Sequence, residues 1–147
     1  MKVIDMAVHN VATTTGDQTI CDCAAQMRHE HVGSLVVVDA DMQPLGMITD
    51  RDIAIEVVAR RLDPQTLLVK DVMTTPVVSA TPNESMVIAL ARMREFGIRR
   101  LPIVDEDGKL VGVISNSNLV EELSSLLDGL VRNIHSSKSR EVALRSE

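Results

Sequence analysis

The chain has no tryptophan, no tyrosine and a single phenylalanine among its 147 residues. Single-stranded nucleic acids are usually held on aromatic stacking platforms, and nucleic-acid duplexes need a broad basic surface. With a formal net charge of −6 and almost no aromatic residues, this chain offers neither. The composition therefore argues against nucleic-acid binding, and any anionic ligand must be held by a local basic group against an unfavourable overall field.

Cysteines and long apolar runs are also scarce. The two cysteines, Cys21 and Cys23, are too few for a disulfide scaffold and are typical of a reducing compartment. No apolar run approaches the roughly 20 residues of a membrane span. The first ten residues include Asp5 and lack the apolar segment of a secretory signal. We therefore expect a cytoplasmic protein with no membrane segment.

The strongest pattern in the chain is an internal repeat with an offset of 66 residues, in which residues 24–53 align on residues 90–119 without a gap. The matched pairs include Met27 and Met93, Leu35 and Leu101, Asp39 and Asp105, Gly46 and Gly112, and Ile48 and Ile114. Two units of this size seldom bury their apolar faces alone, so we expect them to pack against each other. Such packing relates the two repeats by a pseudo-twofold axis, so a cleft along that axis is lined by one copy of each motif from each repeat.

Each repeat is predicted to form a strand, a helix, two strands and a second helix. Thr15-x-x-Gln18 and Thr81-Pro82-x-Glu84 are expected to start the first helix of each repeat. The second helices are expected to follow Thr49, running to about Leu62, and Ser115. The predicted strands are 8–14, 35–38, 45–48, 101–104 and 110–114.

The segments HVGSLVVVDADMQPLGMITDRDI and GIRRLPIVDEDGKLVGVISNSNL resemble the cystathionine-β-synthase (CBS) domain, of which a tandem pair is called a Bateman module. The resemblance covers about residues 1–125. It implies an α/β fold of two pseudo-symmetric βαββα repeats packed sheet to sheet around a central cleft. We expect repeat 1 at 1–62, a linker at 63–70, repeat 2 with an extended helix at 71–134, and a frayed or loosely helical tail at 135–147. No segment remains for a catalytic domain, so the resemblance implies a stand-alone pair that is not an enzyme.

Thr49-x-x-Asp52 is predicted to cap a helix N-terminus, with Asp52 as the answering residue of a capping box. The family resemblance implies a further role, in which this motif holds the ribose of a nucleotide. A carboxylate is a pure acceptor and can take both ribose hydroxyls, and a helix N-terminus favours phosphate. The counterpart is Ser115-x-x-Asn118, where the amide keeps one acceptor oxygen but loses the charge. We expect two unequal sites, with the better one at Asp52.

Arg99 and Arg100 replace Gly33 and Ser34 of the first repeat. They are either a solvated pair near a helix C-terminus or, as the resemblance implies, phosphate ligands that reach a nucleotide held by Asp52. The resemblance also implies that apolar strand residues hold the base; here these are Met47, Val77, Val78 and Ile98, for which core packing is an equal alternative.

Cys21-x-Cys23 with His29 and His31 suggests a metal site only superficially. Residues two apart on a helix point about 200° apart, so both cysteines cannot face one ion. The second repeat has Val87 and Ala89 at the cysteine positions, which is typical of core packing. We predict no metal site.

The hypothesis is a regulatory module that binds AMP, ADP or ATP between the repeats and signals to a protein partner by a change of their relative angle. One alternative is an interaction or oligomerisation module without a small ligand, which Asn118 favours. The other is a sensor of S-adenosylmethionine, which has a ribose but no phosphates. The resemblance implies a homodimer of flat-disc shape, and the apolar stripe from Leu119 to Ile134 favours self-association independently.

Overall fold

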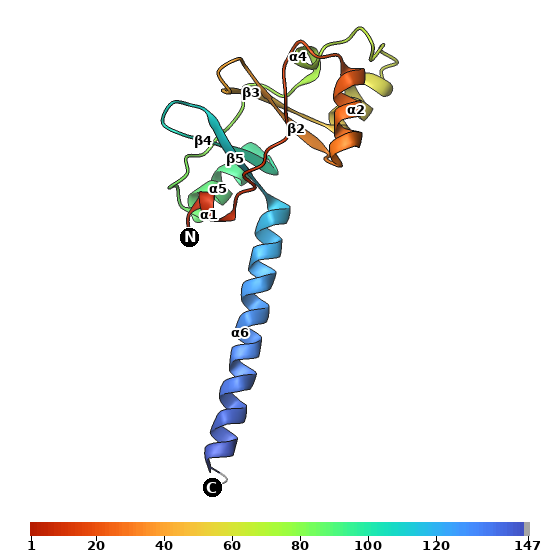
Figure 1. Cartoon of the computed structure of the whole chain (residues 1–147). Helices are drawn as coiled ribbons and strands as arrows, with labels where there is room; N and C mark the ends of the chain where they lie inside the picture. The colour runs from red at the N-terminus through yellow and green to blue at the C-terminus, as the bar shows by residue number, and fades with distance from the viewer. Residues whose placement is uncertain (146–147) are drawn as a thin grey trace.

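The computed structural model describes residues 1–145, which form two lobes of matching architecture and one long helix that leaves them (Figure 1). Repeat 1 contains β1, α2, β2, β3, α3 and the π-helical turn η1, and repeat 2 contains α5, β4, β5 and α6. The bounds are α1 Val3–Met6, β1 Thr13–Thr14, α2 Ile20–Glu30, β2 Ser34–Val38, β3 Pro44–Thr49, α3 Asp50–Ile53, η1 Ala54–Val58, α4 Val69–Val72, α5 Met86–Phe96, β4 Arg100–Val104, β5 Leu110–Ser115 and α6 Asn116–Arg145. The predicted fold class is confirmed.

The sheets reproduce the 66-residue offset in their register. In repeat 1, β1 pairs parallel to β2 and β2 pairs antiparallel to β3, with Ser34 opposite Thr49. In repeat 2, β4 pairs antiparallel to β5, with Arg100 opposite Ser115, and an isolated parallel bridge from Ala80 to Ile103 stands where β1 stands in repeat 1. The apolar strands β2 and β4 are largely buried, and side chains of each belong to the core of its repeat.

Two short helices complete the cores, and each contributes one buried valine to a core. Val3 of α1 is fully buried in the core of repeat 2, beside Met86 and Leu101. Val69 of α4, its equivalent by the repeat offset, is fully buried in the core of repeat 1. The N-terminal helix therefore belongs to repeat 2 although repeat 1 follows it in the chain, so the chain passes between the lobes twice.

The two crossing segments lie directly against a glycine of the lobe that they leave. Thr74 pairs with Met47 of β3, and Val8 pairs with Val113 of β5. A Cβ atom on Gly46 would lie 2.6 Å from the carbonyl oxygen of Thr74, and one on Gly112 would lie 3.2 Å from that of Val8. Each repeat keeps this glycine because the crossing backbone occupies the space of a side chain.

The lobes also touch at the turns between their paired strands. The side chain of Gln43 donates to the carbonyl oxygen of Asp107 at 3.2 Å, and the amide of Leu110 donates to the carbonyl oxygen of Met42 at 2.9 Å. These bonds join the β2–β3 turn to the β4–β5 turn. The repeats therefore face each other, as the repeat pattern predicted.

The predicted starts of the first helices are wrong by about four residues. Helix α2 begins at Ile20 with Thr19 as its cap, and α5 begins at Met86 with Ser85 as its cap. The amides of these first helical residues donate to the carbonyl oxygens of Leu67 and Met1, which precede α4 and α1 in the chain. Thr15 and Thr81 instead start turns, because contacts from outside the local sequence set where each helix begins.

The last helix is longer than predicted. We expected the extended helix to end near residue 134, with a frayed or loosely helical tail after it. Helix α6 continues without interruption to Arg145, and residues 146–147 lie outside the described part of the chain. No proline follows Ser115, so nothing stops the helix locally. Among residues 1–145, no helix has the combination of length and apolar content that crossing a bilayer requires.

The glycine contacts lead to a stability prediction. Gly46→Ala forces a methyl group against the Thr74 carbonyl oxygen, so we expect it to lower the free energy of unfolding by roughly 1–3 kcal/mol. Gly129→Ala is the matched control, because nothing lies within 4 Å of its added Cβ atom in the exposed helix α6. It should raise stability by about 0.5–1 kcal/mol. Urea unfolding followed by circular dichroism measures both, and equal effects would contradict the close approach.

Candidate functional site

The first capping motif forms as predicted at the junction of β3 and α3. The Asp52 amide donates to the Thr49 hydroxyl at 3.0 Å, and the Thr49 amide donates to Oδ2 of Asp52 at 2.9 Å. The two residues therefore satisfy each other's free amides in a full capping box. The second carboxylate oxygen, Oδ1, makes no hydrogen bond within the described residues, so Asp52 keeps acceptor capacity beyond its structural role.

Asp52 is half-buried and lines a cavity of about 400 Å³. That volume lies within the usual range of small-molecule sites. The other lining residues come from η1, from the loop after it, and from α4 and the crossing segment: Glu56, Arg60, Leu62, Leu67, Asp71, Val72 and Thr74. Arg60 is paired with Glu56 at 3.4 Å. The cavity is therefore acidic on balance and includes the crossing segment in its wall.

The second capping motif keeps the geometry and loses the charge. The Ser115 amide donates to Oδ1 of Asn118 at 3.2 Å, and the Ser115 hydroxyl bonds the same oxygen at 2.7 Å. The Asn118 amide returns a bond to the Ser115 hydroxyl at 3.2 Å. The one acceptor oxygen of Asn118 is thus shared between two donors of its own cap.

The arginine pair lies beside this second cap. Arg100 faces Ser115 across the β4–β5 ladder, and the amide of Asn116 donates to the carbonyl oxygen of Arg99 at 3.0 Å. Arg99 is exposed and lines a cavity of about 750 Å³, together with α5 residues and Asn116. Asp52 and Arg99 thus line two different cavities, and their predicted convergence on one hollow stays a prediction.

The predicted base-binding residues are split between the lobes. Met47 is half-buried and pairs with Thr74, which lines the Asp52 cavity. Val77 and Val78 follow on the same crossing segment. Val78 and Ile98 pack against the core of repeat 2, as the core-packing alternative predicted. Ile98 also lines the larger cavity with Arg99.

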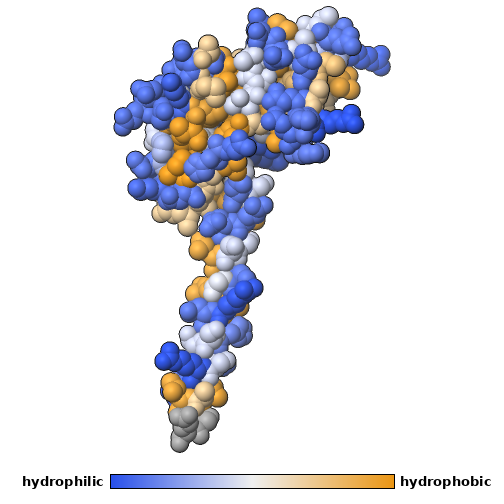
Figure 2. Space-filling view, in the orientation of Figure 1, coloured by the Kyte–Doolittle hydropathy of each residue, from blue (hydrophilic) through white to orange (hydrophobic). Residues whose placement is uncertain are grey.

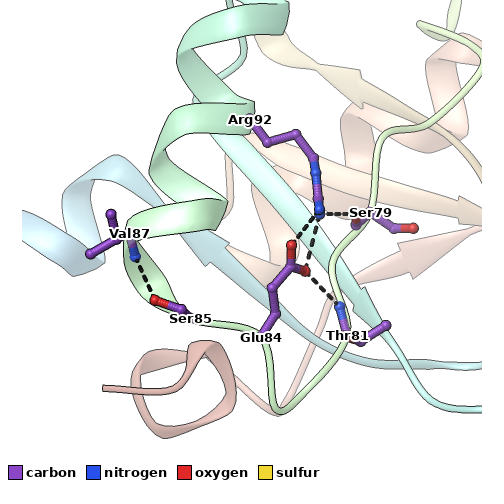
Figure 3. Close-up of polar contacts among 6 residues, drawn as sticks. All are labelled: Ser79, Thr81, Glu84, Ser85, Val87 and Arg92. Carbon is purple, nitrogen blue, oxygen red and sulfur yellow. Dashed lines mark hydrogen bonds and ion pairs between the residues drawn. The ribbon is translucent and has the colours of Figure 1, made fainter.

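A polar network that the sequence did not predict links α5 to the segment around the Ala80 bridge (Figure 3). Arg92 forms an ion pair with Glu84 and donates to the carbonyl oxygen of Ser79 at 2.8 Å, and Glu84 also accepts from the Thr81 amide. In repeat 1, Gln26 donates to the carbonyl oxygen of Thr13 at 2.7 Å, at the equivalent position. The repeat offset could have predicted this contact, because it aligns Gln26 with Arg92. The network makes Arg92 a structural cation.

The cysteine and histidine group is dispersed by the helix geometry. Cys21 is exposed on α2 while Cys23 is buried in the core of repeat 1, in line with their angular separation. Burial raises the pKa of the Cys23 thiol to about 11. His29 and His31 are exposed near the end of the helix. Within residues 1–145, no three potential metal ligands gather around one point.

The sequence model of the CBS domain matches the chain twice, at residues 3–59 and 69–125. The chain belongs to the CBS domain family. Protein MK0525 of Methanopyrus kandleri is 34% identical over 121 residues, which span 82% of this chain and 62% of that protein. The CBS domain-containing protein YhcV of Bacillus subtilis is 41% identical over 125 residues, which span 84% of this chain and 87% of YhcV. This CBS chain thus covers less than two thirds of the first relative's length.

Solved structures give the same family. A protein with CBS domains from Burkholderia ambifaria MC40-6 superposes with a TM-score of 0.75 at 31% identity, over 84% of this chain and 93% of that one. The CBS domain pair of protein MJ0100, solved in complex with 5′-methylthioadenosine and S-adenosyl-L-methionine, superposes with a TM-score of 0.76 over 85% of this chain and 97% of that one. Its identity is 22%, so this second likeness concerns the fold alone.

The two thiols should react differently. At pH 8 a thiolate-specific reagent should label Cys21 rapidly and leave Cys23 unlabelled until the chain unfolds, because burial keeps Cys23 protonated and inaccessible. Its raised pKa also means that the unfolded chain ionises first, so this thiol's contribution to stability is lost as the pH rises from 9.0 towards about 11.

Mass spectrometry of the labelled protein counts the reacted thiols. Cys23→Ala is the control, since repeat 2 has the buried Ala89 at this position. It should remove only the slow site. Equal labelling rates for both cysteines in the folded protein would contradict the packing of α2.

Proposed function

We propose that this CBS pair is a regulatory module that binds an adenosine-containing nucleotide, AMP, ADP or ATP, between its repeats. The observation that supports it most is the half-buried Asp52 carboxylate, which has one oxygen outside its cap and lines a cavity of about 400 Å³. A carboxylate at that position can accept from the 2′- and 3′-hydroxyls of a ribose. Thr49 fixes its orientation, so the acceptor is preorganised.

The fold family supports the adenosine part of the proposal. The MJ0100 pair, which shares the fold, was solved with two adenosine compounds, and both of them contain a ribose. Neither carries a phosphate, so S-adenosylmethionine remains the alternative ligand for this chain. The arginine pair favours a nucleotide, because guanidinium groups suit phosphate oxygens better than they suit a cationic sulfonium.

Phosphate binding needs cations from outside the Asp52 cavity. Glu56 and Asp71 line that cavity, and its one arginine is already paired with Glu56. A nucleotide bound there would direct its phosphates away from these carboxylates. The proposal therefore assigns the phosphates to Arg99 and Arg100 of repeat 2, which makes the ligand a bridge between the repeats.

Such a bridge would be coupled to the relative position of the lobes. Thr74 lines the Asp52 cavity and belongs to the crossing segment that continues to Ala80, which pairs with β4 of repeat 2. A ligand that favours one angle between the repeats would shift the population towards it. That shift would be the signal to a protein partner, and no catalytic step is proposed.

A second candidate function, assembly without a small ligand, is favoured by the exposed apolar side chains of two helices. Val87, Ile88 and Phe96 of α5 are exposed, and so is a stripe on α6. Monomeric proteins rarely expose apolar patches of this extent. The homodimer expected from the family is compatible with both functions, so ligand binding is what separates them.

The ribose role is tested by Asp52→Asn, which copies the cap that Asn118 forms in repeat 2. The variant should keep the ligand-free stability within about 1 kcal/mol, because an amide oxygen still caps the helix. It should lose most of the thermal stabilisation that AMP or ATP gives the wild type. That stabilisation would be roughly 2.7 kcal/mol at a ligand concentration of 100 times the dissociation constant. A dye-based assay is required, since the chain has no tryptophan or tyrosine.

Asn118→Ala is the comparison variant for that assay, and it should leave the main response intact. If Asp52→Asn kept the full ligand-induced thermal shift, Asp52 would not be a ligand-binding residue. Wild-type protein that responds to no adenosine compound would instead favour the assembly function.

The phosphate role is tested by Arg99→Gln combined with Arg100→Gln. The double variant should lose at least tenfold in affinity for ATP, because charge-assisted bonds to the phosphates disappear, and should bind adenosine as the wild type does. Isothermal titration calorimetry measures both affinities. Arg28→Gln, on the exposed face of α2, controls for the loss of one of these two positive charges. An equal loss for adenosine and ATP would assign the arginines to the fold rather than to the phosphates.

A further inference from the structure

Helix α6 leaves the body of the protein almost at once. Leu119 is its one buried residue and packs into the core of repeat 2, whereas every residue from 120 to 145 is exposed. At 1.5 Å per residue, the 30-residue helix is about 45 Å long, and most of it projects into solvent (Figure 1). In proteins most helical stability comes from tertiary packing of an apolar face.

The projecting part carries an apolar stripe with the spacing of a coiled coil. Val120, Leu123, Leu127, Leu130 and Ile134 follow one another at intervals of three and four residues, and each is between 56% and 62% exposed. Leu126 and Val131 widen the stripe on its two sides. Apolar atoms recur along one edge of the helix (Figure 2). Alternating intervals of three and four place these side chains along one face, where a second helix can interdigitate with them.

The charges of α6 are segregated along its length. The first half carries Glu121, Glu122 and Asp128, and the second half carries Arg132, Lys138, Arg140 and Arg145 against the single acid Glu141. A parallel second copy would therefore set acids beside acids and bases beside bases. In the heptad register of the stripe, Glu141 would face its own copy at the core of the interface. An antiparallel copy sets each acidic half beside a basic half, and the helix dipoles also oppose.

We propose that two copies of this chain associate through an antiparallel pairing of their α6 helices. The stripe from Val120 to Ile134 packs on its own copy about a twofold axis near Leu127, which places Val120 near Ile134 and Leu123 near Leu130. The contact is isologous, so it closes at two chains. The pairing goes beyond the proposed ligand binding and does not depend on it.

The interface is tested with the full-length chain by Leu127→Glu, which places two carboxylates together at the axis. We expect the dimer to dissociate at least a hundredfold more readily, measured by sedimentation velocity over a range of protein concentrations. Ser125→Glu adds the same charge on the opposite face of α6 and should leave the dimer intact. A monomeric wild type at high micromolar concentration, or a Leu127→Glu variant that stays dimeric, would overturn the proposal.

The orientation is tested by disulfide cross-linking in a Cys21→Ser background, which removes the exposed native thiol. Val120→Cys chains mixed with Ile134→Cys chains should form the mixed disulfide under mild oxidation, and Val120→Cys chains alone should remain uncross-linked. A parallel pairing gives the reverse result, with Val120→Cys chains joined to each other. That result would overturn the antiparallel arrangement even if the chain is a dimer.

Discussion

The architecture depends on the exchange of short helices between the lobes. Val3, in the first turn of the chain, is buried in the core of repeat 2, and Val69 fills the same place in repeat 1. Neither repeat has a complete core without a segment that reaches it from beyond its own strands. The backbone that carries this exchange passes over Gly46, where a Cβ atom would lie 2.6 Å from the Thr74 carbonyl oxygen, and over Gly112, where one would lie 3.2 Å from that of Val8. The pair is therefore one cooperative unit, and a force on a crossing segment acts on both lobes.

The two repeats share a frame but differ where chemistry is expected. Both form a capping box at the end of the third strand of the unit, yet one has the Asp52 carboxylate and the other has the Asn118 amide. The arginine pair has no counterpart in repeat 1, where the matching residues are Gly33 and Ser34. The carboxylate and the cations are thus assigned to opposite repeats, which is what a bridging nucleotide would need.

Local patterns predicted the elements well and their starting points less well. The later two strands of each repeat lie within one or two residues of the predicted ranges, whereas β1 is shorter and the first strand of repeat 2 is reduced to the bridge at Ala80. The helices α2 and α5 start later than their threonine motifs suggested, because the backbone just before α4 and α1 accepts hydrogen bonds from the amides of Ile20 and Met86. Helix α6 continues past residue 135 because the exposed tail contains no residue that breaks a helix. Contacts between residues far apart in the chain leave no local sequence pattern from which these helix starts could be predicted.

The amino-acid sequence by itself determined the twofold repetition, the fold class, the two capping boxes and the segregation of Asp52 from the arginines, because each depends on residue types at fixed spacing. Only the tertiary structure decided which core each short helix enters, since the equivalent valines are interchangeable in pattern. It also decided that Asp52 shares a cavity wall with Thr74, and that the apolar stripe of α6 stands clear of the body. These are matters of where distant segments meet, and packing in three dimensions, rather than periodicity, decides them.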